Sequence, residues 1–214
     1  MKVLVVGANG QIGSQLVEKL HSGQKHEVRA MVRKEEQAEK FRGDGVETVL
    51  ADLEGSVEDI AAAAKGCDAV VFTAGSGPNT GMDKTILVDL DGAVKTVEAA
   101  EKAGVSRYIQ VSAIQANNRE NWSEKIRPYF AAKHYADREL IRSSLNYTII
   151  RPGGLLNEPG TGKVKAAENL ERASIPREDV ASVIAAALDE EKTYKKSFDL
   201  VSGDLSPEEA LREL

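Results

Sequence analysis

The sequence predicts an α/β protein built on a doubly wound parallel sheet flanked by helices. Two observations support this fold class. Short apolar runs rich in β-branched residues alternate with longer amphipathic segments, which is typical of strand–helix–strand crossover units. The first of these runs leads directly into a glycine-rich loop, from Gly7 to Gly13, that opens a helical segment.

The strands up to Arg151 are predicted from continuous apolar runs, which suit strands buried on both faces. They span residues 2–6, 28–32, 46–50, 68–73, 107–111 and 147–150. The helices between them are predicted from helical spacing of apolar residues or from helix-forming composition. They span residues 12–20, 34–42, 57–65, 86–103 and 129–143.

The pattern is less regular after Arg151, where residues 152–162 are rich in proline and glycine. A helix, a strand and a terminal helix are predicted beyond this segment, over residues 178–188, 197–201 and 207–214. No linker-like stretch separates them from the preceding part. We therefore expect one domain over residues 1–214, in which residues 152–214 form a short C-terminal extension on the substrate side.

Composition and charge exclude several classes of protein. With 42% hydrophobic and 29% charged residues, the 214-residue chain is not disordered, collagen-like or disulfide-stabilised. Its single cysteine, Cys67, allows no intrachain disulfide, and with three histidines we expect no metal site. The net charge of −6 argues against a nucleic-acid partner. No apolar run suits a signal peptide or a membrane span, so we expect a cytoplasmic monomer or homodimer with no membrane partner.

The glycine loop has the spacing G-x-x-G-x-x-G. Glycine permits the tight turn, the close approach of phosphates to the backbone and the close packing of helix on strand. The N–H groups at the helix N-terminus then bind the anion. We expect cofactor contacts from Gly7, Asn9, Gly10, Gln11, Ile12 and Gly13. The alternative is a plain turn with glycine caps.

The residues after the second strand favour NADP over NAD. An NAD site has an acidic residue there for the ribose 2′-hydroxyl, whereas this chain has Arg33 and Lys34. A guanidinium suits a 2′-phosphate. The alternative is that both are solvated residues at the start of a helix. After the fourth strand, the backbone of Thr73, Ala74 and Gly75 should also line the cofactor, because ligands of such sheets bind at the carboxyl ends of the strands.

These motifs together resemble the short-chain dehydrogenase/reductase superfamily, in its extended and atypical branches. The resemblance spans most of the chain and includes Thr73-Ala74-Gly75, Ser112, Tyr129-x-x-x-Lys133 and Arg151-Pro152-Gly153-Gly154. It is greatest to small atypical members, NAD(P)-dependent epimerase-like or NmrA-like. The resemblance implies an NAD(P)-binding Rossmann fold.

The resemblance also implies roles for residues that the spacing alone does not explain. Asp52 and Leu53 would lie against the adenine, although Asp52 has the alternative role of capping the next turn. Pro152, Gly153 and Gly154 would contact the cofactor. Asp89 stands where the superfamily's catalytic set has asparagine; an ionised aspartate only accepts hydrogen bonds, so a proton relay through it would be altered.

The expected chemistry centres on Tyr129 and Lys133, which lie four residues apart and so share one helix face. A cation beside a phenol favours phenolate, so Lys133 with an oxidised nicotinamide would lower the pKa of Tyr129 from its usual value near 10. Lys133 would also reach the nicotinamide ribose. Ser112 would orient a substrate oxygen; its alternative role is a strand-end cap.

The sequence thus predicts an NADP-dependent oxidoreductase that transfers a hydride to or from a small carbonyl, alcohol or sugar-like substrate, with epimerase or dehydratase chemistry as a variant. The alternative is a non-catalytic, NADP-binding redox sensor, which Asp89 favours and Ser112, Tyr129 and Lys133 disfavour. Two further residues are left open. Trp122 is either a lid over the substrate or a packed surface aromatic, and the resemblance implies that Arg177 borders the substrate cleft.

Overall fold

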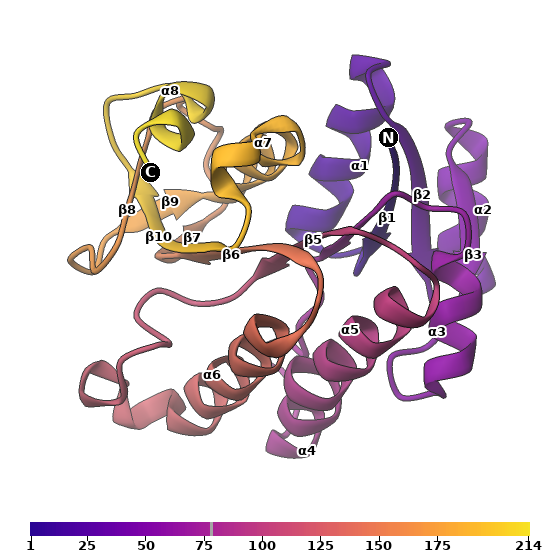
Figure 1. Cartoon of the computed structure of the whole chain (residues 1–214), viewed down its shortest axis with the longest axis horizontal. Coiled ribbons are helices and arrows are strands. Elements are labelled where there is room, and N and C mark those ends of the chain that lie inside the picture. The colour runs from indigo at the N-terminus through magenta and orange to yellow at the C-terminus, as the bar shows by residue number, and fades with distance from the viewer. Residues whose placement is uncertain (78) are drawn as a thin grey trace.

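The computed structural model describes residues 1–77 and 79–214 and contains an eight-stranded, mostly parallel sheet (Figure 1). The strand order is β3-β2-β1-β4-β5-β6-β10-β8, and only β8 runs antiparallel to its neighbour. The strands are β1 (Lys2–Val6), β2 (Glu27–Val32), β3 (Glu47–Leu50), β4 (Ala69–Phe72), β5 (Arg107–Val111), β6 (Asn146–Pro152), β8 (Val164–Ala167) and β10 (Lys196–Ser202). The predicted fold class, a Rossmann-type sheet flanked by helices, is confirmed.

Helices cover both faces of this sheet, as Figure 1 shows for α1 and α7 on one side and α5 and α6 on the other. The core on the first side includes residues of α1 (Gln11–Gly23), α2 (Glu35–Gly43), α7 (Arg177–Asp189) and α8 (Pro207–Arg212). The core on the second side includes α3 (Val57–Ala64), α5 (Ala93–Lys102) and α6 (Arg127–Arg142).

Strand β1 shows why its sequence is apolar throughout rather than alternating. Val3 and Val5 belong to one core, and Leu4 and Val6 belong to the other. All four side chains are fully buried. Because successive residues of a strand point to opposite faces, a sheet covered on both sides needs an apolar residue at every position.

The predicted helix over 86–103 differs from the observed one in its first half. A short helix, α4 (Met82–Lys84), leads into a π-helical segment, η1 (Thr85–Gly92), and only then into α5. Such segments are rare and occur often at functional sites. The periodicity of apolar residues did not reveal it: Ile86 and Leu87 are exposed in this segment, whereas Asp89 and Gly92 are buried.

The tail after β6 contains strands that the sequence did not predict. Strand β8 joins the edge of the main sheet beside β10, and β7 (Gly154–Leu156) pairs with β9 (Ser174–Pro176) in a separate two-stranded sheet. Each is too short to show periodicity. The remaining elements are three short 3₁₀ turns at Arg119–Asn121, Glu124–Ile126 and Glu191–Thr193. In the described part of the chain, no helix has the length and apolar character to span a membrane.

Candidate functional site

The glycine loop follows β1 in the way that close backbone approach requires. Gly7 has a φ of +83°, and a Cβ there would lie 2.6 Å from the backbone nitrogen of Ala74. A Cβ on Gly13 would lie 2.2 Å from the carbonyl oxygen of Gly7. A side chain at either position would therefore collide with backbone, and the loop needs glycine at both.

The N-terminus of α1 is left open for an anion. Its N-cap is Gly10, which offers no side-chain cap, and the first turn contains no acidic residue. Asn9, Gly10 and Gln11 are exposed, whereas Ile12 is buried beneath them. Backbone N–H groups at such a terminus bind phosphate well. These features fit a dinucleotide pyrophosphate.

Arg33 and Lys34 lie between β2 and α2, and both are exposed. Neither side chain forms a hydrogen bond or ion pair with any residue that the structure describes, and the adjacent Glu35 pairs with Arg42 instead. A hollow of about 440 Å³ beside them is lined by Arg33, Val49, Leu50, Ala51, Asp52, Gly55, Asp59, Ala62 and Ala63. The guanidinium of Arg33 is therefore available to a ligand at this corner.

Asp52 and Leu53 lie at the same corner, after β3. The Asp52 carboxylate accepts a hydrogen bond from the backbone nitrogen of Glu54 at 3.0 Å, which is the turn-capping role left open by the sequence. Leu53 packs against the end of η1, where its Cβ would lie 3.0 Å from a Cβ on Gly92. Contact of either residue with adenine stays a prediction.

The segment after β4 is fixed by two side chains. The Thr73 hydroxyl donates to the carbonyl of Val6 at 2.9 Å, which ties it to β1. Asp89, carried by η1 and 1% exposed, accepts a hydrogen bond from the backbone nitrogen of Ser76 at 3.0 Å. A Cβ on Gly75 would lie 3.1 Å from the Asp89 carboxylate. Asp89 thus has a structural partner in the loop that borders the site.

Lys133 is a largely buried cation that has no protein partner among the described residues. It is 2% exposed, and its Nζ lies 5.8 Å from the centre of the Phe72 ring. No described residue forms a hydrogen bond or ion pair with that ammonium group. The ammonium group is therefore free to bind a ligand, which fits the ribose hydroxyls expected beside it.

The pKa of Tyr129 in the protein without cofactor is governed by burial. Burial raises the pKa of its phenol well above the usual value, and the carboxylates of Asp89 and Asp137 add to the effect. Burial also lowers the pKa of Lys133, while the same two carboxylates partly oppose this change. The expected lowering of the Tyr129 pKa by Lys133 together with an oxidised nicotinamide concerns the cofactor-bound protein and stays a prediction.

Asp137 is a site residue that the sequence reasoning missed. It is 2% exposed and lies on α6 one turn beyond Lys133, so Tyr129, Lys133 and Asp137 share one helix face. Its carboxylate accepts from Gln110 Nε2 at 2.8 Å, Ser112 Oγ at 3.0 Å and Arg151 Nε at 3.1 Å. The repeated four-residue spacing was the signal that would have revealed it.

Ser112 therefore has a different role from the strand-end cap considered for it. It directly follows β5, is 3% exposed, and directs its hydroxyl to a side chain rather than to a backbone group. Arg151, which is 4% exposed, forms the buried ion pair of this network with Asp137. Asp199 lies nearby on β10; burial raises the pKa of its carboxyl, and the charge of Arg151 partly opposes this rise.

The glycines after β6 have a packing explanation. A Cβ on Gly153 would lie 2.0 Å from the carbonyl oxygen of Ala173, and Gly154 donates its N–H to the same oxygen at 2.9 Å. Pro152 and Gly153 are buried. Close approach of the segment before β9 therefore accounts for glycine at 153, and cofactor contact by Pro152, Gly153 and Gly154 stays a prediction.

Aromatic residues pack beside the catalytic candidates. Trp122 stacks on Phe130 with ring centres 6.4 Å apart and donates from Nε1 to the carbonyl of Ala116 at 3.1 Å. His134 Nδ1 bonds the same carbonyl at 2.8 Å. Trp122 is thus a packed aromatic in this structure. Arg177, at the start of α7, donates to Asn157 Oδ1 at 2.6 Å.

Comparison with known families explains the combination of an open helix N-terminus and an unpartnered buried lysine. The model of the NAD(P)H-binding family matches residues 7–191. The chain belongs to this family. It is 61% identical over all 214 residues to the Bacillus subtilis protein named uncharacterized sugar epimerase YhfK, and the match covers all of both chains.

Solved structures of similar proteins agree with this assignment. A Bacillus halodurans protein, named for the NAD-dependent epimerases/dehydratases, is 46% identical, with a TM-score of 0.93 over 100% of both chains. The anaerobillin reductase ChuY from Escherichia coli O157:H7 is 28% identical, with a TM-score of 0.83 over 97% of this chain and 100% of ChuY. The chain is therefore an NAD(P)-binding protein of an oxidoreductase- and epimerase-like family.

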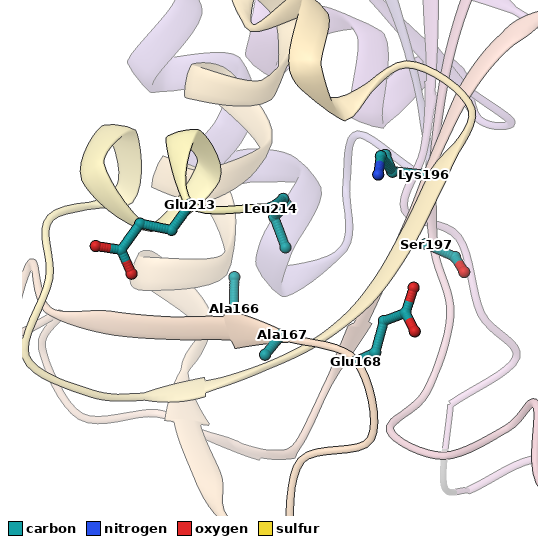
Figure 2. Close-up of a pocket in the computed structure, with 7 residues that line it drawn as sticks. All are labelled: Ala166, Ala167, Glu168, Lys196, Ser197, Glu213 and Leu214. Carbon is teal, nitrogen blue, oxygen red and sulfur yellow. The ribbon is translucent and has the colours of Figure 1, made fainter.

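A second hollow of this NAD(P)H-binding protein, of about 230 Å³, lies apart from the predicted site residues (Figure 2). It lies between β8, β10 and the C-terminus and is lined by Ala166, Ala167, Glu168, Lys196, Ser197, Glu213 and Leu214. Within residues 1–77 and 79–214, no three metal-ligating side chains are grouped to hold an ion.

Proposed function

We propose that this protein is an NADP-dependent oxidoreductase that reduces the carbonyl group of a small substrate, with Tyr129 as the proton donor. The observation that carries the proposal is the shared face of α6. It places Tyr129 beside a buried, unpartnered Lys133, one turn from the Asp137 that binds Ser112.

The residues that would hold the cofactor are those with unused binding capacity. The open N-terminus of α1 would hold the pyrophosphate, and Arg33 would hold the 2′-phosphate of NADP. The ammonium group of Lys133 would bind the nicotinamide ribose. When bound, the nicotinamide supplies or accepts the hydride.

The protonation state of Tyr129 in the resting protein suits a proton donor. A phenol with a raised pKa is protonated at neutral pH, so Tyr129 is a proton donor in the resting protein. A carbonyl that receives a hydride needs a proton on its oxygen, and Tyr129 supplies it. One relative is named a sugar epimerase and another a reductase; we choose the reductive reaction, in which a protonated phenol donates to the carbonyl oxygen.

Replacing Tyr129 with phenylalanine tests the proposal. Tyr129→Phe keeps the ring and the glycine loop, so NADPH affinity should stay near that of the wild type. Turnover of carbonyl substrates, followed by NADPH absorbance over a panel of aldehydes, ketones and quinones, should fall by about 10²–10⁴-fold because the proton donor is lost. Tyr135→Phe is the matched control, since Tyr135 lies on α6 with an exposed side chain.

Two outcomes would contradict the proposal. Equal turnover by wild type and Tyr129→Phe would exclude Tyr129 as the proton donor. Absence of turnover over the whole panel, with NADPH still bound, would favour the redox-sensor alternative. Capture of a protein partner that depends on NADPH would then support it.

Arg33→Ala tests the choice of cofactor. Loss of a charge-assisted pair with the 2′-phosphate should weaken NADPH binding by about 10–150-fold, while NADH binding should be unchanged because NADH has no such phosphate. Fluorescence titration with each nucleotide measures both affinities. Arg138→Ala removes an exposed arginine from α6 and serves as the charge-matched control. An equal loss for both nucleotides would refute the assignment.

A further inference from the structure

The hydrogen bonds of Asp137 fix the direction of the Ser112 hydroxyl proton. Asp137 is buried, and each of its described side-chain contacts comes from a donor: the amide of Gln110, the hydroxyl of Ser112 and the guanidinium of Arg151. An ionised carboxylate can only accept hydrogen bonds, so the proton between Ser112 and Asp137 belongs to the serine.

A serine hydroxyl has one proton and two lone pairs. With its proton directed at Asp137, Ser112 has only lone pairs to offer to another group. Ser112 directly follows β5, and the next residue, Ala113, belongs to the cluster against which Tyr129 packs. Ser112 and Tyr129 thus border the same cluster, and the Ser112 oxygen can accept but not donate a further hydrogen bond.

We propose that Asp137 is a positioning residue that holds the Ser112 proton inside the protein, so that Ser112 recognises a substrate hydroxyl as an acceptor and the substrate is a hydroxycarbonyl compound. This inference rests on the proposed function, in which Tyr129 donates to the carbonyl oxygen. The two residues are then complementary: Tyr129 donates to a carbonyl oxygen, and Ser112 accepts from a hydroxyl beside it.

The alternative pairing of groups is disfavoured by the same geometry. If Ser112 donated to the carbonyl oxygen, its bond to Asp137 would break and leave a buried carboxylate with one donor fewer. A ketone without a neighbouring hydroxyl would leave the Ser112 lone pairs unused. Preference for a hydroxyketone over its methyl ether is therefore the measurable consequence, since the ether keeps the oxygen but lacks the proton.

The experiment compares three matched ketones: hydroxyacetone, methoxyacetone and acetone, or the same series built on the carbonyl compound that the wild type reduces fastest. For the wild type, kcat/KM should be about three- to tenfold higher for the hydroxyketone than for its ether, as one neutral hydrogen bond provides. Ser112→Ala should remove this preference, chiefly through KM of the hydroxyketone, while the ether is still reduced.

Two substitutions at Asp137 separate positioning from folding. Asp137→Ala removes the acceptor and frees the Ser112 proton, so the preference for the hydroxyl should disappear. Asp137→Asn should retain it, because the new amide oxygen still accepts from Ser112 and the new NH₂ can donate to Gln110 Oε1, which is buried and has no partner in the described residues. A merely structural role would lower turnover of all three ketones alike.

Glu139→Gln removes a charge from the solvent-facing side of α6 and is the control, as Glu139 pairs only with Arg142 among the described residues. Urea unfolding provides a readout that needs no substrate. The midpoint losses of Ser112→Ala and Asp137→Ala should be less than additive in the double variant, whereas those of Ser112→Ala and Glu139→Gln should add.

Failure of this inference is distinguishable from failure of the proposed function. If Tyr129→Phe abolishes turnover but wild type and Ser112→Ala show the same hydroxyl-to-ether ratio, Asp137 does not position Ser112 for substrate and the inference is wrong. Additive midpoint losses for Ser112→Ala and Asp137→Ala would also overturn it. If Tyr129→Phe reduces all three ketones at the wild-type rate, the proposed function itself is wrong.

Discussion

Helices α1 and α7 lie on the same face of the sheet, yet their N-termini are built in opposite ways (Figure 1). Helix α1 begins after a glycine and has no acidic residue in its first turn. Helix α7 has Glu178 and Asp179 in its first turn, and both carboxylates accept hydrogen bonds from the loop at residues 160–162. Asp179 accepts from the backbone nitrogens of Thr161 at 2.9 Å and Gly162 at 2.8 Å.

The difference shows that the chain keeps its own carboxylates away from the N-terminus of α1 but not from that of α7. At α7 two carboxylates stand in the first turn, where their charge would repel a phosphate, and Glu178 accepts from the backbone nitrogen of Gly160 at 2.8 Å. At α1 no carboxylate competes. Glycine serves both regions: at Gly13 it avoids a collision with the loop backbone, and at Gly160 it avoids the Asp179 carboxylate, which a Cβ would approach to 2.7 Å.

The largest effect on stability and NADPH binding is expected from a substitution in the glycine loop at the N-terminus of α1. In Gly13→Ala, the new Cβ would collide with the carbonyl of Gly7, so the loop must move away from β1. Overpacking of this kind should lower the free energy of unfolding by about 3 kcal/mol, measured by urea denaturation, and NADPH binding should be lost.

Gly23→Ala, at the other end of α1, is the control because a Cβ there meets nothing within 4 Å. This change should leave NADPH binding unaltered. Normal NADPH affinity in Gly13→Ala would show that the loop tolerates displacement and would weaken the contrast between the two helices.

An intermediate effect on stability is expected from removing a carboxylate at the N-terminus of α7. Asp179 is only 1% exposed. Asp179→Ala therefore leaves the N–H groups of Thr161 and Gly162 without their hydrogen-bond acceptor. The free energy of unfolding should fall by about 2 kcal/mol, while NADPH affinity stays at the wild-type value, because α7 does not hold the pyrophosphate. Calorimetric titration with NADPH and urea unfolding measure the two quantities.

Glu208→Ala provides the reference, since Glu208 is an exposed acid in the first turn of α8 whose side chain bonds no described residue. Its stability should be close to that of the wild type. A loss of NADPH affinity in Asp179→Ala equal to that in Gly13→Ala would mean that both termini serve the cofactor.

The smallest effect concerns the far ends of the two helices, which Asp189 joins. Burial alone would raise the pKa of this carboxyl, but hydrogen bonds from Lys25 and His26 outweigh burial and lower it. A lowered pKa means stability that is present above the unfolded value of about 3.8 and lost as the pH falls through the folded value. Asp189→Asn should therefore lower the free energy of unfolding by about 0.5 kcal/mol near neutral pH.

The difference in the free energy of unfolding between wild type and Asp189→Asn should shrink as the pH falls below the pKa of this carboxyl in the unfolded chain. Urea unfolding at neutral and at strongly acidic pH measures it. A difference that is the same at both pH values would show that the contribution of Asp189 is not ionic.

The sequence was most informative about the buried parts of the fold. Runs such as Lys2–Val6 and Arg107–Val111 predicted their strands with the observed bounds, because a strand covered on both faces must be apolar throughout. Strands β7 and β9 were not predicted. Their pairing depends on the close approach of Ala173 to Gly153, a contact between distant segments that local sequence does not record.

In the candidate site, too, the features set by local sequence could be predicted and those set by distant contacts could not. The glycine loop and the Tyr129–Lys133 spacing are local patterns, so their placement could be foreseen. The raised pKa of Tyr129 could not, because it results from burial and from Asp89 and Asp137, of which Asp89 comes from a separate segment. Periodicity likewise did not show that Asp89 is carried by a π-helical turn.

Trp122 gives the molecule an internal optical probe. It is the only tryptophan in the chain, so all indole fluorescence comes from one position, stacked on Phe130, whose ring also contacts that of Tyr129. The reduced nicotinamide ring absorbs light at the wavelengths that indole emits. Energy transfer from Trp122 should therefore report occupancy of the site in the unlabelled protein, and it distinguishes the reduced cofactor from the oxidised one, which does not absorb there.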